Sequence, residues 1–377
     1  MRVGSVQGPA TQKGFVEAAY SDLKAAHHLE QIAALRLGEQ IVPRQVQLIL
    51  SDLCNQGCSF CAYRMDDGLS VEKFAGPNGE KNPNRMIPAG KAREIIEDCA
   101  ELGVMAIQFT GGGEPTVHPA HMALFEYASS LGMRTALVTN GLKLESGWED
   151  TFPKMSWIRV SLDAGTADTY GATRQTPVRN FNRVQDNISM ISAAIRDAGS
   201  DCYLGVGFVV TPENYKEIGL GVRAARSTGA AYVRMSAMFS KNFMAPFIGI
   251  YDEIKELVAN AKAECETATF KVVDLFGERL ADLQQHAPDY EFCGYQQFNM
   301  YIGGDLNVYR CCSTSYTEHG KTGTLTNMRL RDWFLSEAKR EAYGSFDARS
   351  CRLCQFNTKN RVINYMVSAS PQHVEFV

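Results

Sequence analysis

Six short apolar runs that alternate with helical patterns limit this chain to a parallel-sheet fold. Successive strand–helix units form parallel sheets, and right-handed crossovers curl such a sheet into an open or partial barrel. The pattern predicts an α/β protein with a partial (β/α)6 TIM-like barrel. The six predicted strands are 45–51, 104–110, 134–140, 157–163, 202–210 and 230–238.

The character of the sequence changes along the chain and predicts four regions. Residues 1–44 are expected to form an N-terminal helical extension, and residues 45–240 the barrel. Residues 241–290 have helical periodicity and are predicted to be a helical linker. From residue 291 onward come short strand-like pieces, loops and a short helical pattern. Residues 291–377 are therefore expected to form a small C-terminal α+β domain.

Composition excludes several classes of partner. The chain of 377 residues is 45% hydrophobic and 21% charged, with a net charge of −4. This balance gives no reason to expect a nucleic-acid or membrane partner. No apolar run approaches the roughly 20 residues of a spanning helix, and the first residues lack the apolar core of a signal peptide. The expected location is the cytoplasm.

Eight of the cysteines form two groups, and Cys99, Cys202 and Cys265 stand singly. The chain has 11 cysteines, and in a reducing compartment metal binding or catalysis is a better explanation for them than disulfides. Three lie in "CNQGCSFC" at 54–61, and five lie at positions 293, 311, 312, 351 and 354. Two groups so far apart predict two metal sites.

Polar and glycine-rich loops follow the predicted strands. "CNQGCSFC" follows the first strand, "GGGEP" (111–115) the second, "TNG" (139–141) the third and "SLDAG" (161–165) the fourth. The carboxyl ends of parallel strands lie at one edge of the sheet and hold functional loops. The four loops are therefore expected to converge on one site.

Three thiolates on one loop are one ligand short of a closed site. Iron–sulfur clusters usually have four cysteine ligands, so three would leave one iron open to a substrate or cofactor. A zinc site with a distant fourth ligand is the alternative, but zinc pairs usually come as Cys-x2-Cys twice or with histidines. No histidine lies between residues 29 and 117. Packed thiols are a third possibility, although a polar loop with a glycine is a poor core.

The loop resembles a known signature. "CNQGCSFC" is similar to the CxxxCxxC motif of the radical S-adenosylmethionine (SAM) superfamily, with Phe60 where that family usually has an aromatic residue. "TGGGEP" stands after the second strand, where the family carries its GGE motif. The resemblance covers about residues 45–365. It implies a [4Fe–4S] cluster on Cys54, Cys58 and Cys61, whose open iron chelates SAM.

The resemblance also implies the chemistry. In the family, an electron from the reduced cluster cleaves the sulfonium of SAM, and the 5′-deoxyadenosyl radical abstracts a substrate hydrogen. The cofactor supplies this step, and the protein positions and shields it. Gly112 and Gly113 would let the backbone approach the methionine moiety. Glu114 would accept a hydrogen bond from its ammonium group.

Other residues match the family less sharply. Ser161 and Asp163 stand where relatives contact the ribose, although Asp163 could instead cap a turn. Asn140 is expected to face the same site. "TYGATRQT" resembles a segment whose arginine pairs with the SAM carboxylate, which makes Arg174 a candidate; a solvated surface arginine is the alternative. Gly207 and Phe208 either lie along the adenine or pack within the sheet.

The second cysteine group has the composition of a closed site. Four thiolates could hold zinc or a [4Fe–4S] cluster. The region resembles the SPASM/twitch modules of radical SAM enzymes, and the absence of cysteine from "QFNTKNRVINYMV" implies one auxiliary [4Fe–4S] cluster, the twitch pattern. The four expected ligands are Cys293, Cys311, Cys351 and Cys354.

One ligand of the auxiliary cluster is ambiguous. Leu306 replaces the turn glycine that is usual a few residues before the ligand, so either Cys311 or Cys312 could bind the cluster. We favour Cys311. The spare Cys312 is then either a hydrogen-atom donor or a buried thiol.

The loop at 62–88 and the substrate complete the predictions. This long polar loop is expected to cover the substrate. The first hypothesis for function is a radical SAM enzyme that epimerises, oxidises or cross-links a peptide or protein side chain. The second is a dehydrogenase or epimerase of a sugar, aminocyclitol or other small molecule. The third is a non-catalytic iron–sulfur sensor. Flavodoxin or ferredoxin is the expected electron donor for either enzyme.

Overall fold

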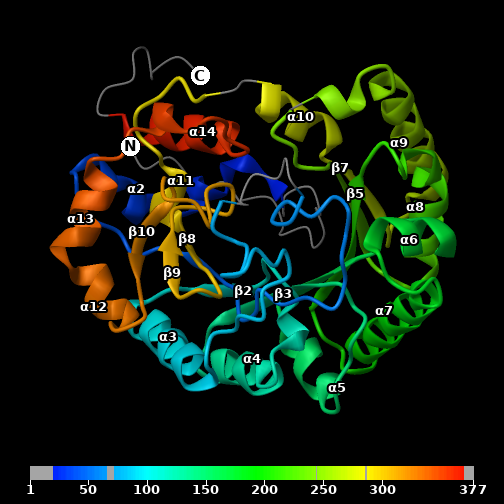
Figure 1. The fold of residues 1–377 in the computed structure, drawn as a ribbon, viewed down its shortest axis with the longest axis horizontal. Helices are drawn as coiled ribbons and strands as arrows, with labels where there is room; N and C mark the ends of the chain where they lie inside the picture. Colours follow the sequence, from blue (N-terminus) through cyan, green and yellow to red (C-terminus); the bar gives the residue numbers. More distant parts are fainter. Residues whose placement is uncertain (1–19, 66–71, 243, 285–286, 369–377) are drawn as a thin grey trace, which may run out of the picture.

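A ten-stranded sheet in the order β10-β9-β8-β1-β2-β3-β4-β5-β6-β7 forms the centre of the protein (Figure 1). The computed structural model describes residues 20–65, 72–242, 244–284 and 287–368. Strands β1 to β7 pair in parallel, each with the next. Their bounds are Gln45–Leu48, Ala106–Phe109, Arg134–Thr139, Trp157–Ser161, Tyr203–Val210, Tyr232–Ala237 and Lys271–Asp274.

Helices follow the strands and lie around the outside of the curved sheet (Figure 1). This alternation confirms the predicted α/β class with a parallel sheet. Among the described residues, β7 and β10 are the two edges of the sheet, so hydrogen bonds do not close the barrel. The outer helices are α3 (Ala89–Leu102), α4 (His121–Ser130), α5 (Trp148–Thr151), α6 (Ala167–Arg174), α7 (Asn180–Asp197), α8 (Ile218–Ser227) and α9 (Tyr251–Cys265).

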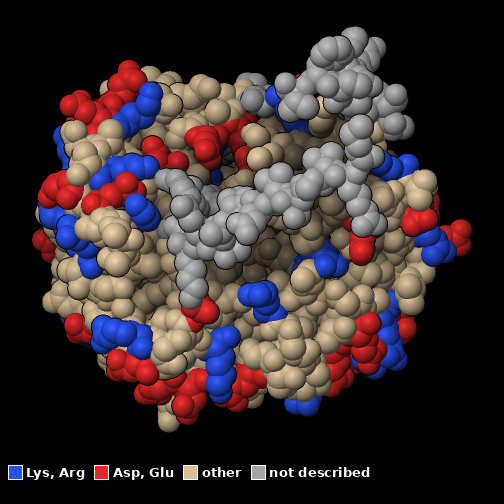
Figure 2. Space-filling view, turned by 180° about the vertical axis from the view of Figure 1, so that it is seen from behind, with Lys and Arg blue, Asp and Glu red and all other residues tan. Residues whose placement is uncertain are grey.

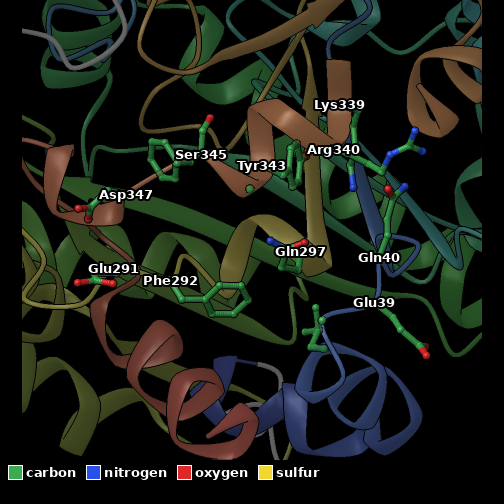
Figure 3. A pocket seen from close by; sticks show the side chains of 14 residues that line it. Glu39, Gln40, Glu291, Phe292, Gln297, Lys339, Arg340, Tyr343, Ser345 and Asp347 are labelled. Carbon is green, nitrogen blue, oxygen red and sulfur yellow. The ribbon is translucent and has the colours of Figure 1, made fainter. Parts of the chain in front are cut away.

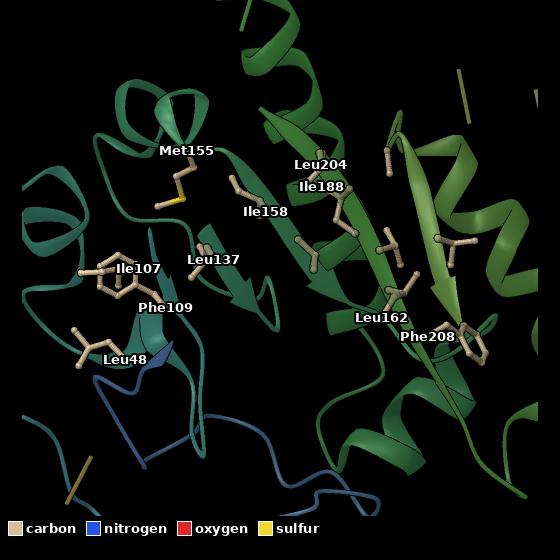
Figure 4. Packing of buried hydrophobic residues seen from close by; sticks show 14 of the residues in the cluster. Leu48, Ile107, Phe109, Leu137, Met155, Ile158, Leu162, Ile188, Leu204 and Phe208 are labelled. Atoms are coloured by element: carbon tan, nitrogen blue, oxygen red, sulfur yellow. The ribbon is translucent and has the colours of Figure 1, made fainter. Parts of the chain in front are cut away.

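Side chains alternate between the two faces of the sheet because a strand has a period of two. The outward side chains are apolar and pack against the helices, as Figure 4 shows for Leu48, Phe109, Ile158 and Ile188 of α7. Each such side chain contributes about 1.5–3 kcal/mol when fully buried. The inward positions carry polar side chains instead, among them Gln47, Gln108, Arg159 and Arg234.

The region predicted as a helical linker holds more than helices. It contains α9, α10 (Phe276–Gln284) and, unexpectedly, strand β7. Val272 of β7 pairs with Val233 of β6, so this strand extends the parallel sheet. A run of four residues is too short to stand out as a strand in the sequence. The division of the chain at residues 44, 240 and 290 stays a prediction.

The C-terminal region continues the same sheet. Strand β8 (Asn299–Ile302) pairs in parallel with β1, and β9 (Asn307–Tyr309) pairs antiparallel with both β8 and β10 (Lys321–Thr324). Leu306, in the turn before β9, has a positive φ of 63°. It adopts the left-handed conformation that glycine usually supplies. The remaining helices are α11 (Tyr295–Phe298), α12 (Leu330–Leu335), α13 (Glu337–Gly344) and α14 (Asn357–Val367).

The described part of the N-terminal extension packs on the last helix. It contains a 3-10 turn at Asp22–His27 and helix α2 (Leu29–Arg36), and α2 and α14 lie side by side in Figure 1. Lys359 of α14 forms an ion pair with Asp22. The Arg36 Nε donates to the Met366 carbonyl at 2.6 Å. The two ends of the described chain therefore support one another.

Acidic and basic side chains are intermixed on the face seen in Figure 2, in keeping with the small net charge. Within the described residues, no helix has the length and apolar character needed to cross a bilayer.

Candidate active site

A cavity of about 270 Å³ lies where the loops after the parallel strands meet. It brings together every residue predicted to contact the cluster or SAM, although their roles stay predictions. These lining residues are Cys54, Cys58, Phe60, Cys61, Gly112, Gly113, Glu114, Asn140, Ser161, Asp163 and Arg174.

Helix α6 holds the loop that carries the three thiols. The Gly57 amide donates to the Arg174 carbonyl at 3.1 Å, and the Ser59 amide donates to the Thr173 carbonyl at 2.9 Å. A Cβ on Gly57 would come within 2.9 Å of the Gln175 side chain, so this close approach favours glycine. The loop is thus fixed by the carboxyl end of a helix.

Buried thiols and nearby cations define the electrostatics of the loop. Burial raises the pKa of Cys58 to about 12, while Arg174 opposes this rise. Burial also raises the pKa of Cys54 and of Cys61, and Arg64 opposes both shifts. Metal binding takes thiolates and releases their protons. Three thiols in one cavity beside two cations are a donor set that fits an iron–sulfur cluster.

Glu114 joins the ends of β2 and β3. Its Oε1 accepts hydrogen bonds from the Thr139 hydroxyl at 2.7 Å and from the Thr116 hydroxyl at 2.8 Å. Its Oε2 accepts from the Asn140 amide at 2.7 Å. Burial raises the pKa of Glu114, and these donors oppose the rise. The carboxylate is therefore oriented within the cavity by three residues before any ligand binds.

The two glycines before Glu114 are needed by the protein itself. A Cβ on Gly113 would lie 2.3 Å from the Leu53 carbonyl oxygen, and one on Gly112 would lie 2.3 Å from the Phe74 ring. Real Cβ contacts are never this short, and backbone cannot move aside as a side chain can. The close approach of the Asp52–Leu53 backbone therefore requires glycine at position 113, and the Phe74 ring leaves no room for a side chain at position 112.

Arg174 and Asp163 lie buried together. Arg174 is 3% exposed, so it is not a solvated surface residue. Its guanidinium pairs with Asp163 and donates to the Gln56 Oε1 at 2.5 Å. Asp163 has a positive φ of 56° and accepts from the Val209 amide at 2.6 Å. The carboxylate therefore connects β4, β5 and α6 rather than capping an exposed turn.

The sequence analysis missed part of the cavity wall. Ser236 and Arg234 of β6 and Arg279 of α10 also line the cavity. The signal was the alternation in "YVRMSA", which places polar residues on the inward face of a strand. Phe208 faces the other way: it is 1% exposed and packs in the outer core, so it does not lie along the cavity.

In the second cysteine group, Cys311 and Cys312 have different neighbours. Burial, and next the Cys311 thiol, raise the pKa of Cys351 to about 12 and that of Cys354 to about 11. Cys311 also raises the pKa of Cys293. Cys312 interacts instead with Arg279 and accepts from Gln355 at 3.2 Å. This arrangement favours Cys311 as the fourth member of the group.

No three His, Cys, Asp or Glu side chains within the described ranges are arranged to hold a single metal ion. The metal-binding roles of both cysteine groups stay predictions.

The loop at 62–88 is bonded to the C-terminal region where it is described. Phe74 packs edge-on against Tyr316, with ring centroids 4.9 Å apart. The Arg85 Nε donates to Asp52 at 2.5 Å, and the Tyr316 hydroxyl donates to the same carboxylate. The predicted covering role of the loop stays a prediction, and its residues 66–71 lie outside the described residues.

A separate cavity of about 550 Å³ lies beside α13 (Figure 3). Lys339 and Tyr343 line it, together with Glu39 and Phe292. It contains none of the predicted site residues.

The structure combines a parallel sheet with a three-thiol loop after β1 and a glutamate after β2. This combination is typical of one class of cofactor-dependent barrel enzyme. Residues 48–219 match the radical SAM superfamily. The chain therefore contains a radical SAM domain.

Curated relatives resemble parts of this chain. An S-adenosylmethionine-dependent nucleotide dehydratase of Flammeovirga pacifica is 33% identical over 133 residues, which are 35% of this chain and 42% of the relative. A PqqA peptide cyclase of Gluconobacter oxydans is 24% identical over 194 residues, 52% of this chain and 49% of the relative. The chain spans less than half the length of either protein.

A solved structure resembles nearly the whole chain. Streptococcus suis SuiB, bound to the precursor peptide SuiA, has a TM-score of 0.59 and 15% identity. The match covers 97% of this chain and 82% of SuiB. At this identity the likeness shows the fold alone.

Proposed function

We propose that the protein is an enzyme that cleaves SAM reductively and abstracts a hydrogen atom from a substrate held in the barrel. The convergence of three thiols, Glu114 and four arginines in one cavity is the observation that carries this proposal. A [4Fe–4S] cluster with bound SAM would supply the 5′-deoxyadenosyl radical. The chain's own residues would bind, orient and shield the reactants.

The roles of the protein groups follow from their positions. Cys54, Cys58 and Cys61 would hold the cluster, and Arg64 and Arg174 would offset the negative charge of its thiolates. The remaining predicted contacts would bind SAM around Glu114. These are Phe60, Gly112, Gly113, Asn140, Ser161 and Asp163.

The proposal allows two classes of substrate, a peptide or protein side chain and a small molecule. A peptide or protein side chain is supported by the fold likeness to SuiB with its precursor peptide and by the similarity to the PqqA peptide cyclase. A small molecule is supported by the similarity to the nucleotide dehydratase. One specific observation favours the small molecule: cationic side chains line the cavity below the thiols. A peptide would not by itself require them.

An auxiliary [4Fe–4S] cluster on Cys293, Cys311, Cys351 and Cys354 completes the proposal. Such a cluster could accept an electron from a substrate radical, as dehydrogenation or cross-linking needs. Cys312 lies beside Arg279, which itself lines the cavity, so Cys312 is proposed as a hydrogen-atom donor for an epimerisation. Flavodoxin or ferredoxin in the cytoplasm would supply the first electron.

Product analysis tests the proposal. The iron-reconstituted, dithionite-reduced protein should convert SAM to 5′-deoxyadenosine and methionine. C58S, which removes one thiol of the loop, should abolish the product. A protein that carries both clusters and binds SAM, yet forms no 5′-deoxyadenosine, would be the non-catalytic sensor instead.

A further inference from the structure

Three arginines of the barrel interior interact with one another. Arg234 of β6 and Arg279 of α10 line the cavity that holds the three thiols. Arg159 of β4 lines a second cavity of about 980 Å³, together with Tyr20 and Tyr232. Arg159 interacts electrostatically with Arg234 and with Arg279. The three guanidinium groups therefore form one cationic cluster between two cavities, which we call the arginine cluster.

Strand β5 makes room for this cluster. Gly205 and Gly207 face the barrel interior between β4 and β6. A Cβ on Gly207 would touch the Arg159 side chain at 3.7 Å, and one on Gly205 would overlap the Tyr232 ring at 2.1 Å. Glycine inside a strand weakens it and marks a close approach. Here two glycines in one strand leave space for large polar side chains in the lumen.

No carboxylate among the described residues forms an ion pair with the arginine cluster, although Cys312 and Asp282 interact electrostatically with Arg279, and Tyr20 interacts with Arg159 and Arg234. Within residues 20–65, 72–242, 244–284 and 287–368, no carboxylate lies within ion-pair distance of Arg159, Arg234 or Arg279. The arginine–carboxylate ion pairs of these residues involve other arginines. The buried Nε of Arg234 has no hydrogen-bond partner. Aromatic rings contact the guanidinium groups instead: Arg279 lies 4.0 Å from the Phe239 ring and Arg234 5.4 Å from the Tyr20 ring.

The titration behaviour agrees with this geometry. Burial, and next the charge of Arg159, lower the pKa of Arg234 to about 9. Burial also lowers the pKa of Arg279 to about 10. Arg174 provides the contrast within the same cavity, because its charge is matched by Asp163 and its pKa is raised. Among the residues that the structure describes, Arg174 of this cavity therefore has a carboxylate partner, whereas Arg234 and Arg279 have none.

Arg159, Arg234 and Arg279 are half-buried. A cation that is partly withdrawn from water without a carboxylate beside it is penalised, and groups perturbed in this way cluster at functional sites. Guanidinium groups match carboxylate and phosphate oxygens with paired hydrogen bonds. A single carboxylate would offset one of three charges, whereas a phosphate carries a charge of about −1.5 to −2 and a diphosphate carries more.

We propose that the arginine cluster binds a phosphate or diphosphate group of the substrate and thereby holds the rest of that substrate toward the thiol loop. This inference rests on the proposed radical chemistry for its biological meaning. The binding site itself does not depend on that chemistry. Arg234 and Arg279 contact the anion, and Arg159 adds charge from the side of the second cavity.

Calorimetric titration of the anaerobic holoprotein tests the site. Inorganic pyrophosphate is the probe, and the dicarboxylate glutarate is the comparison, both at one fixed ionic strength because screening would otherwise differ. Pyrophosphate should bind at least tenfold more tightly than glutarate. R234Q/R279Q should weaken pyrophosphate binding at least tenfold, and R159Q should weaken it less.

The controls separate this proposal from the proposed function. R223Q removes an exposed arginine that pairs with Glu264 on the surface, and it should bind pyrophosphate as the unchanged protein does. The far-ultraviolet circular dichroism spectrum and the melting temperature of R234Q/R279Q are compared with those of the unchanged protein, and agreement shows that the variant folds. If that variant does not fold, R234Q and R279Q are measured separately. Pyrophosphate binding that is no tighter than glutarate binding, or that survives these substitutions, overturns the site. Loss of SAM cleavage in the unchanged protein overturns only the proposed function.

Discussion

Arg174 and Asp163 form a buried ion pair that joins the carboxyl end of α6 to the end of β4. Arg174 also carries the carbonyl to which the thiol loop is bonded, through the Gly57 amide at 3.1 Å. The same residue thus supports the loop by its backbone and offsets the thiolate charge of Cys58 by its side chain.

Removal of one member of this pair should destabilise the protein strongly. R174Q leaves the Asp163 carboxylate buried without its cation, at a cost of about 3–5 kcal/mol. The free energy of unfolding from denaturant titration is the measurement. R174Q/D163N should recover part of the loss, since no buried charge is left alone. A loss below about 1 kcal/mol in R174Q would show that the pair contributes little.

Glu114 should be intolerant even of an isosteric amide. In E114Q, one of the two oxygens that accept from Thr116, Thr139 and Asn140 becomes a donor, so at least one buried donor loses its acceptor. We expect SAM affinity to fall at least tenfold by equilibrium binding. E126Q is the control, because Glu126 accepts a hydrogen bond from Thr151 and lies outside the cavity. Unchanged SAM binding in E114Q would contradict the proposed orienting role.

Gly113 and Gly90 form a matched pair of glycines. A Cβ on Gly113 would strike the Leu53 carbonyl at 2.3 Å, so G113A should displace the thiol loop and reduce cluster incorporation, measured as iron content. Gly90 lies in α3, and a Cβ added to it would meet nothing within 4 Å. G90A should instead stabilise the protein by about 0.4–1 kcal/mol. Equal iron content in the two variants would refute the steric argument.

Adjacent cysteines should differ in their effect on the auxiliary cluster. C311S should lower bound iron by about four atoms per chain, because one [4Fe–4S] cluster loses a ligand. C312S should retain the iron, since its thiol faces Arg279 and Gln355 rather than the other three cysteines. Iron analysis with the electron paramagnetic resonance spectrum distinguishes the two. Iron loss in C312S alone would reverse the assignment.

Lys339 should make stability depend on alkaline pH. It is 3% exposed, and burial lowers its pKa to about 8. In the unfolded chain the amine titrates near 10.4, so the folded state binds fewer protons between these values and stability rises with pH there. Below pH 8 the full cost of the buried charge is present. K339M should therefore raise the free energy of unfolding by about 1–3 kcal/mol at pH 7.

The gain in K339M should shrink as pH rises from 8 toward 10. Melting temperatures over this range provide the measurement. K255M is the control. Lys339 and Lys255 both lie over aromatic rings, Lys339 at 4.2 Å from that of Tyr343 and Lys255 at 5.4 Å from that of Tyr251, but Lys255 is exposed. A gain in K339M that does not change with pH would point to packing rather than charge.

Much of the barrel could be predicted because the apolar runs of parallel strands are local signals. All six predicted strands appear, with shorter ends. Strand β7 was missed because its four residues give too little pattern. The pairing of β8 with β1 was also missed, because it joins residues about 250 apart and periodicity alone does not specify such a pairing. The position of Leu306 in a glycine-like turn explains the departure noted in the sequence.

Most predicted residues of the cavity could be found because they follow strands whose carboxyl ends face the same edge. Arg174, at the end of α6, was found from the resemblance of "TYGATRQT" instead. Arg234 and Arg279 were missed for different reasons. Arg234 is inside a strand, where one polar residue among apolar neighbours looks like solvent exposure, and Arg279 lies on a helix of the predicted linker. Besides the alternation in "YVRMSA", Gly205 and Gly207 were a second available signal, because they marked a strand with large neighbours on its inner face.

Strand β1, which carries the thiol loop, is completed on one side by a segment translated much later. Its edge opposite β2 pairs with β8, at Asn299–Ile302. During synthesis this edge therefore stays open while about 250 residues emerge, exposed to the mispairing that unprotected strands invite. Cluster insertion into the thiol loop before β8 arrives would act on a half-supported strand. The strand order of the sheet thus sets an order of assembly. The carboxyl-terminal region must dock before the thiol loop after β1 becomes fully rigid.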